Sequence, residues 1–149
     1  MNMYNRAVIL NDLANNYAIK MRYTKAIEKY REALSLYIEL AKDKPVEYGV
    51  HIAHVFSNLS IIYLNLSKPQ ESELLHLNAL KMHRALTKHN PEKYSLMFIN
   101  CLIEGVSYLK QHTLTLYEAE LIITRIQNNL DVESLQKKIQ SLRIIQREE

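Results

Sequence analysis

The chain has 149 residues, of which 48% are hydrophobic and 23% charged, and a formal net charge of +3 at pH 7. This length suits one domain with its own apolar core. Only two glycines and three prolines occur, which disfavours turn-rich β folds and predicts an all-α protein, because helix interiors reject both residue types. The single cysteine, Cys101, excludes an internal disulfide and a cysteine-rich metal site.

Charge and hydropathy patterning exclude further classes of protein. Lysine and arginine alternate with glutamate along the chain, so we expect a solvated surface and no nucleic-acid partner. The first residues, MNMYNRAVILNDL, lack the basic start and apolar run of a signal peptide. No run of about 18 apolar residues is present to span a membrane. These observations predict a cytoplasmic protein without a membrane partner.

The first half of the chain contains two pairs of predicted helices. Apolar residues recur at steps of three and four over 7–19 and again over 23–41, which is typical of amphipathic helices. The second helix ends at Asp43–Pro45, since a proline disfavours helical geometry in the residue before it. A third helix is predicted over 50–66, and a fourth begins with Pro69 in its first turn, where its missing N–H costs nothing, and runs to about His89.

The second half continues the pattern. Residues 97–109 and 116–126 predict a third helix pair, and Asn128–Asp131 breaks it, with Asp131 a suitable N-cap. A capping helix follows over 131–147. We therefore expect seven helices in a single domain, 1–149, with repeats at about 7–48, 49–94 and 95–129.

The chain repeats itself with a period of 46 residues. Superposing 8–48 on 54–94 without gaps gives eight identities: Leu13/Leu59, Tyr17/Tyr63, Ala33/Ala79, Leu34/Leu80, Leu40/Leu86, Lys42/Lys88, Pro45/Pro91 and Tyr48/Tyr94. A period of this length with two helices per unit predicts a helical solenoid, whose units must stack to bury their apolar faces.

Each repeat carries a recurrent packing pattern. The first helices read Leu10-x-x-Leu13-Ala14-x-x-Tyr17 and Phe56-x-x-Leu59-Ser60-x-x-Tyr63, and the second helices read Ala26-x3-Tyr30-x2-Ala33 and Ser72-x3-His76-x2-Ala79. Small residues let paired helices cross closely, and large ones fill the spaces between them. These motifs resemble those of the tetratricopeptide repeat (TPR) family over roughly residues 8–127.

A third copy of the pattern is degenerate. Gly105-x-x-Tyr108 matches the step from small residue to tyrosine, but Glu104 stands where the pattern has leucine. Alternatively Leu109 takes the tyrosine place, and the sequence leaves both registers open. Ala119, Ile123 and Ile126 restore the second helix.

The resemblance implies a fold and a class of function. The expected fold is all-α, a TPR-like right-handed α–α superhelix of about three helix pairs with a C-terminal capping helix. The period exceeds the usual length of roughly 34 residues and resembles the long-repeat subclass of about 42–46 residues. Because the concave face of such arrays usually holds a peptide or protein segment, the resemblance implies a noncatalytic protein-interaction module without a cofactor.

The first helix of each pair is expected to line this concave groove with the residues between its packing positions. These are Val8, Asn11, Asp12, Asn15 and Ile19 in the first repeat, His54, Ser57, Asn58, Ile61 and Asn65 in the second, and, if Tyr108 sets the register, Ile99, Leu102, Ile103, Val106 and Lys110 in the third.

Asparagine is enriched among these positions. Its amide both donates and accepts hydrogen bonds, so it can pair with the backbone of an extended peptide. The predicted peptide-binding residues are Asn11, Asn15, His54, Asn58, Ile61, Asn65 and Lys110. The apolar third repeat suggests a partner with hydrophobic side chains. The alternative interpretation is that these asparagines only cover a solvated helix face.

One ligand class can be excluded from the residues. The family's clamp for C-terminal carboxylates of chaperones needs lysine or arginine where Asn11, Ile99 and Ile103 stand. Without those charges a terminal carboxylate would be poorly held.

The residues leave two alternative functions open, a homo-oligomerising structural module and a ribonuclease, and they do not fit a metal site. A structural module could form homo-oligomers, which an exposed stripe of Leu135, Ile139 and Leu142 would favour and a covered one would disfavour. Arg84-x4-His89 matches a motif of the HEPN ribonucleases, in which such groups carry acid–base and phosphate chemistry. The histidine pairs offer too few ligands for zinc, so no metal is expected.

Overall fold

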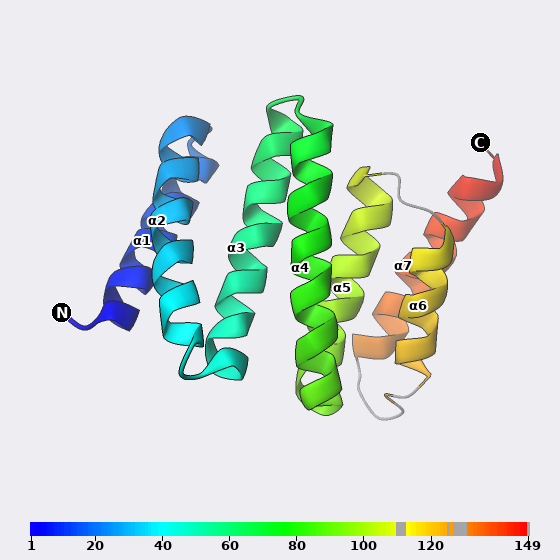
Figure 1. Cartoon of the computed structure of the whole chain (residues 1–149). Coiled ribbons are helices and arrows are strands. Elements are labelled where there is room, and N and C mark those ends of the chain that lie inside the picture. The colour runs from blue at the N-terminus through cyan, green and yellow to red at the C-terminus, as the bar shows by residue number, and fades with distance from the viewer. Residues whose placement is uncertain (110–112, 125, 127–130, 149) are drawn as a thin grey trace. The chain divides into compact units, whose positions relative to one another are not determined.

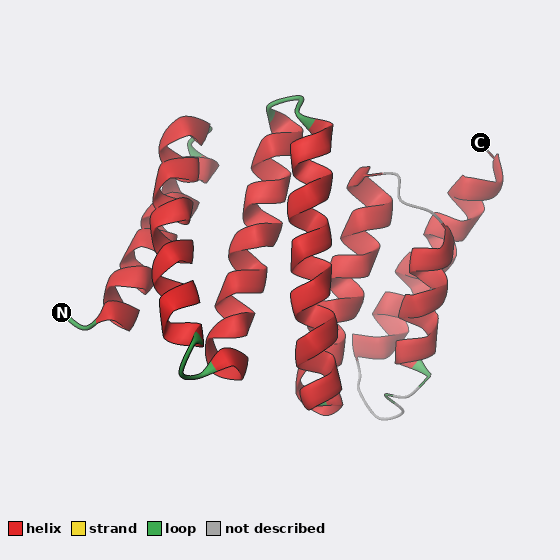
Figure 2. Cartoon of the chain, in the orientation of Figure 1, coloured by secondary structure: helices red, strands yellow, loops and turns green. Residues whose placement is uncertain are grey.

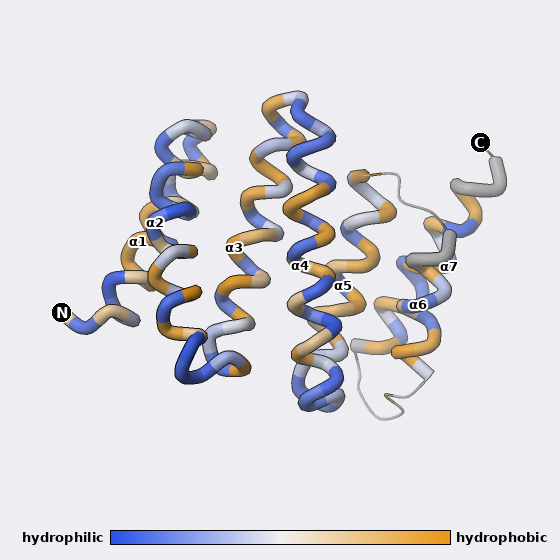
Figure 3. The backbone as a smooth tube through the Cα atoms, viewed as in Figure 1, coloured by the Kyte–Doolittle hydropathy of each residue, from blue (hydrophilic) through white to orange (hydrophobic). Residues whose placement is uncertain are grey.

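The computed structural model describes residues 1–109, 113–124, 126 and 131–148. Across these ranges every regular element is an α-helix, which confirms the all-α prediction (Figures 1 and 2). The helices are α1 Met3–Ile19, α2 Tyr23–Ala41, α3 Pro45–Asn65, α4 Pro69–His89, α5 Pro91–Leu109, α6 Thr113–Ile123 and α7 Asp131–Glu148. Apolar and polar residues alternate around each described helix, as amphipathic packing requires (Figure 3).

Helix starts are set by caps and prolines. In α1 the Asn2 side chain accepts a hydrogen bond from the Asn5 N–H at 2.8 Å, so this helix begins at Met3, four residues earlier than periodicity predicts. The third and fifth helices begin at Pro45 and Pro91, because proline fits the first helical position. Both helices are therefore longer at their N-termini than the sequence analysis placed them.

The chain divides into two compact units. Unit 1 is Met1–Met82 and unit 2 is His83–Glu149, so the boundary falls within α4. In unit 1, α2 packs against both α1 and α3. Its core contains small residues from the paired helices beside two fully buried tyrosines, Tyr30 and Tyr37.

The close crossing within each helix pair uses small residues, as the packing pattern predicts. In the first pair Ala14 and Ala26 are fully buried. The same places in the second pair hold Ser60 and Ser72, and each hydroxyl donates to the other residue's backbone carbonyl, at 2.9 Å and 2.7 Å. The two buried hydroxyls are thereby satisfied, and the serines replace alanines without an orphaned polar group.

The turns inside both pairs share one backbone conformation. Met21 and Ser67, which are 46 residues apart, both have positive φ, 56° and 57°. After each, the chain closes the helix with paired backbone bonds, Met21 N–H to Ala18 and Arg22 N–H to Tyr17 in the first turn. This is the Schellman arrangement, in which the left-handed residue is usually glycine.

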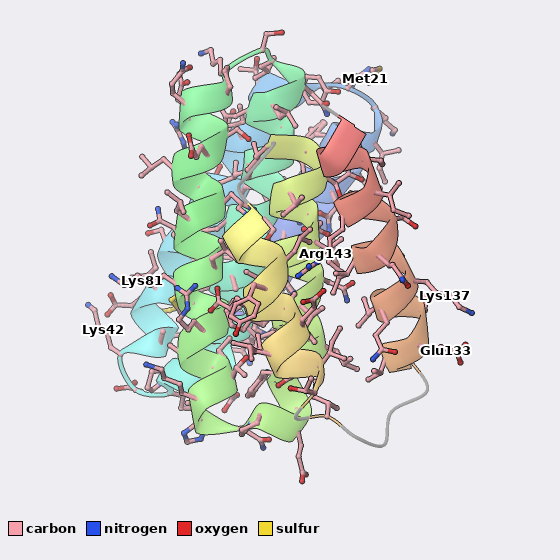
Figure 4. The ribbon with its side chains drawn as sticks, turned by 90° about the vertical axis from the view of Figure 1, so that its right-hand side faces the viewer. Met21, Lys42, Lys81, Glu133, Lys137 and Arg143 are labelled. Atoms are coloured by element: carbon pink, nitrogen blue, oxygen red, sulfur yellow. The ribbon has the colours of Figure 1, made fainter. Side chains whose placement is uncertain are left out.

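Unit 2 contains the end of α4 together with α5, α6 and α7. Its buried residues include Leu116 and Ala119 of α6 and Leu135 and Ile139 of α7. Figure 4 shows Arg143 extending from α7 toward α5 and α6, where its guanidinium pairs with Glu120 at 2.6 Å. The capping helix is therefore packed into unit 2 by an apolar stripe and an ion pair.

Candidate functional site

The predicted groove residues of the first two repeats all lie in unit 1, on α1 and α3. Asn11 and Asn15 come from α1 and are half-buried. His54, Asn58, Ile61 and Asn65 follow α3 at steps of three and four residues, so they share one face of that helix. His54, Ile61 and Asn65 are exposed and Asn58 is half-buried.

A hydrogen-bond network joins α1, α2 and α3 at this face. The Tyr30 hydroxyl of α2 donates to the Asn15 Oδ1, and the Asn58 Nδ2 donates to the same oxygen at 3.4 Å. Burial raises the Tyr30 pKa, while hydrogen bonding to Asn58 opposes that shift. The carbonyl oxygen of Asn15 is thus used within the protein, and it holds Asn58 at this face.

Beside this network lies a cavity of about 250 Å³. It is lined by Ala18, Ile19, Tyr23, Tyr30, Asn58, Ile61, Ile62 and Asn65. Aliphatic and aromatic side chains form most of the lining, and two asparagine amides stand among them. Such a mixture can bury one apolar group of a ligand while pairing with polar atoms next to it.

Toward the N-terminal ends of α1 and α3, aromatic rings form the base of the same face. His51 stacks on Tyr37 with ring centroids 4.8 Å apart and contacts the Tyr4 ring edge-on at 5.7 Å. Burial raises the Tyr37 pKa to about 12, with the charges of Tyr4 and Asp12 adding to the effect. Desolvation lowers the pKa of both His51 and His54, so the two imidazoles are neutral at pH 7.

The third repeat does not supply the apolar groove that the sequence analysis expected. Ile99, Leu102, Ile103 and Val106 are at most 8% exposed, because α5 packs against both α6 and α7. The expectation that these four side chains face a ligand is wrong. Lys110, the last predicted binding residue, lies outside the described residues.

Burial also decides between the two registers left open for the third repeat. Tyr108 is 60% exposed, so it does not occupy the tyrosine packing place. Leu109 is half-buried, and Gly105 and Val106, four and three residues before it, are buried. Leu109 therefore stands at the tyrosine position.

Arg84 of the ribonuclease motif is engaged within unit 2. Its guanidinium donates two hydrogen bonds to Glu118, at 3.0 Å and 2.9 Å, and lies over the Phe98 ring. His89 is exposed at the end of α4. The bidentate pair gives Arg84 a structural role between α4 and α6.

Within the described ranges no cluster of three or more His, Cys, Asp or Glu side chains is arranged to hold a metal ion. Among the described helices, none is both long and apolar enough to cross a bilayer.

The hydrogen bond of Tyr30 at this face was not predicted. The packing pattern predicts the place of its ring correctly, but the Tyr30 hydroxyl donates a hydrogen bond to Asn15 of α1. A buried tyrosine normally finds a hydrogen-bond partner, so asking which polar residue its hydroxyl could meet would have indicated Asn15.

Comparison with known proteins gives a family match over part of the chain. A family model described as tetratricopeptide repeat matches residues 52–91, which cover most of α3 and all of α4. The comparison with curated proteins gives no match.

Proposed function

The chain belongs to the tetratricopeptide repeat proteins, and from this premise we propose that it is a noncatalytic interaction module whose α1–α3 face binds a peptide or protein segment. Tetratricopeptide repeats generally mediate protein–protein interaction. The single observation that carries the proposal for this chain is the cavity of about 250 Å³ in unit 1 beside the Asn15–Tyr30–Asn58 network.

The network supports recognition of a peptide backbone. Because Asn15 Oδ1 accepts from both Tyr30 and Asn58, the Asn58 amide is held at the edge of the cavity. Holding a polar group in place before binding lowers the entropy cost of association. Asn65 lies two helical turns farther along α3 and lines the same cavity, so it offers a second amide to an extended segment.

The cavity supports anchoring by one apolar side chain. Ile61 is 44% exposed and stands between Asn58 and Asn65 on the cavity lining. Covering it would remove apolar surface from water, which favours binding by about 25 cal/mol per Å² before the costs of association. We place the module in a reducing compartment such as the cytoplasm, in keeping with its single cysteine, Cys101, which cannot form a disulfide within the chain.

Site-specific photo-crosslinking tests the proposal. A photoreactive phenylalanine replaces Ile61 at the cavity, and in a matched control it replaces Leu77, which is similarly exposed, at 49%, but on α4. After irradiation in host cells, we expect a protein crosslinked from position 61 and absent from position 77. The crosslink should weaken when Asn58→Ala is added.

Two outcomes would contradict this function. Equal crosslinking from both positions would mean that the surface of unit 1 is contacted without selection for the cavity. A crosslink from position 61 that persists unchanged in Asn58→Ala would remove the amide from the binding site. Far-UV circular dichroism of each variant confirms that the helices are retained.

Self-association through the C-terminal helix is less well supported. Leu135 and Ile139, which would need to be exposed, are 5% and 2% exposed, and Leu142 is half-buried. By the criterion set from the sequence, this burial disfavours that stripe as an oligomer interface.

A further inference from the structure

We propose that the α1–α3 face selects a segment carrying an aliphatic side chain and, about three residues away, a lysine or arginine. This inference rests on the proposed function and adds the chemical class of the partner. It follows from the cavity, from one exposed carboxylate on the same face, and from the distance between them.

The cavity fits an uncharged, aliphatic anchor. None of its eight lining residues carries a charge at pH 7, and Ala18, Ile19, Ile61 and Ile62 supply an aliphatic wall. A charged side chain placed there would lose its hydration without gaining a counter-charge, which is strongly unfavourable. A leucine, isoleucine, valine or methionine would instead remove apolar surface from water on both sides.

Asp12 supplies the charge for the second contact. It is exposed on α1, and no lysine or arginine of the described residues forms an ion pair with it. Its charge also acts on the buried Tyr37 hydroxyl of α2, whose pKa burial chiefly raises to about 12. A basic side chain of a partner could pair with this exposed carboxylate.

The neighbouring groups on the face do not neutralise Asp12. His51 and His54 on α3 are neutral at pH 7 because desolvation lowers the pKa of each. Glu47, at the start of α3, pairs with Lys44 at 3.0 Å. The groove positions of α1 and α3 in unit 1 hold no lysine or arginine, so the local field favours a cationic partner.

Helix geometry sets the spacing between the two contacts. Asp12 and the cavity residue Ile19 are seven residues apart on one face of α1, which corresponds to about 10.5 Å at about 1.5 Å per residue. A peptide in the extended polyproline II conformation advances about 3.1 Å per residue with about three residues per turn, so side chains three residues apart point to the same side. The basic side chain should therefore follow or precede the aliphatic anchor by about three residues.

Selection from a phage-displayed library of random twelve-residue peptides on the purified full chain tests this inference. We expect enriched peptides to carry Leu, Ile, Val or Met with Lys or Arg about three positions away. An enriched peptide, fluorescently labelled, should bind about five- to tenfold more weakly to Asp12→Asn and more weakly still to Asp12→Lys. The matched control Asp43→Asn, which changes an exposed aspartate on the α2–α3 turn, should leave binding unchanged.

The outcomes separate this inference from the proposed function. Enriched peptides that need Asn58 but lack a basic residue, or that bind Asp12→Asn unchanged, would overturn the inference and leave the groove intact as a binding site. Peptides that bind Asn58→Ala and Asp12→Asn as well as the parent would overturn both. A library without any enriched peptide would also count against both.

Discussion

At the scale of single residues, the second repeat shows how one packing pattern tolerates polar substitutions. Tyr30 of the first repeat is replaced by His76 in the second, and its partner Asn15 is replaced by Ile61. His76 is 3% exposed, and its Nε2 makes no hydrogen bond within the described residues. The histidine therefore occupies an aromatic place without the polar partner that the tyrosine has.

His76 predicts a loss of stability in acid. Desolvation lowers its pKa from 6.5 to about 4, so the unfolded chain binds a proton first as the pH falls. Its contribution is complete above pH 6.5 and is lost as the pH falls toward 4, by about 3 kcal/mol. His76→Phe should reduce the fall in unfolding free energy over this range, measured by urea denaturation at several pH values.

The exposed His89 provides the control for this prediction. His89→Gln removes an exposed imidazole and leaves the buried His76 in place, so the loss of stability that His76 causes in acid should remain. A His76→Phe protein that loses as much stability between pH 6.5 and 4 as the parent would show that another group causes the acid sensitivity.

The serine pair at the α3–α4 crossing gives a second residue-scale prediction. Ser60→Ala or Ser72→Ala alone leaves the other buried hydroxyl with fewer partners and should cost about 1–2 kcal/mol. The double variant recreates the buried alanine pair of the first repeat and should be close to the parent. Chemical denaturation of all four proteins checks this, and equal, additive losses would contradict it.

At the scale of elements, the left-handed residues that end α1 and α3 predict a gain in stability. Met21 and Ser67 adopt φ near 57°, which costs a side-chain-bearing residue energy that glycine avoids. Met21 projects outward at this turn (Figure 4) and is 73% exposed, so its replacement removes little packing. Met21→Gly and Ser67→Gly should each stabilise the protein by about 0.5–1 kcal/mol.

Thermal unfolding followed by circular dichroism measures this gain. Lys20→Gly is the matched control, because Lys20 has φ −83° and gains nothing from glycine's freedom. The control should be no more stable than the parent. If both glycine variants at positive φ melt below the parent, the turns are not strained as described.

Helix type and most helix boundaries could be predicted from the sequence, because they depend on local signals. Pro69 begins α4, as predicted, whereas α3 and α5 begin at Pro45 and Pro91, earlier than apolar periodicity predicted. The early start of α1 was missed because the cap is a single Asn2 side chain ahead of any apolar periodicity. The Schellman turns were missed because Met21 and Ser67 stand where glycine would have been the usual sign.

At the scale of the whole molecule, the extent of the groove was the harder prediction. Periodicity shows that α5 is amphipathic, but it does not show which of its faces is covered by a later helix. Packing of α6 and α7 buries Ile99, Leu102 and Ile103. Glu104, in the leucine place of the register first considered, is half-buried, and burial raises its pKa.

The packing of the first two repeats was easier to predict, because the small residues of their motifs are buried at the helix crossings. Ala14, Ala26 and Ala33 are fully buried, as their places in the packing pattern predict. The Asn15–Tyr30–Asn58 network depends on contacts between three helices, with 43 residues separating the two asparagines. Such contacts cannot be derived from local patterns, although the asparagines themselves stood out in the sequence.

The proposed function depends on Asn58 lying in the surface by which this chain holds its partner. The most direct test is capture of host proteins on the tagged full chain, its Asn58→Ala variant and the control Asn16→Ala, which alters an exposed asparagine of α1, with quantitative mass spectrometry. We expect a protein that is retained by the parent and by Asn16→Ala and whose capture falls about tenfold with Asn58→Ala. Equal retention of every captured protein by all three chains would contradict it.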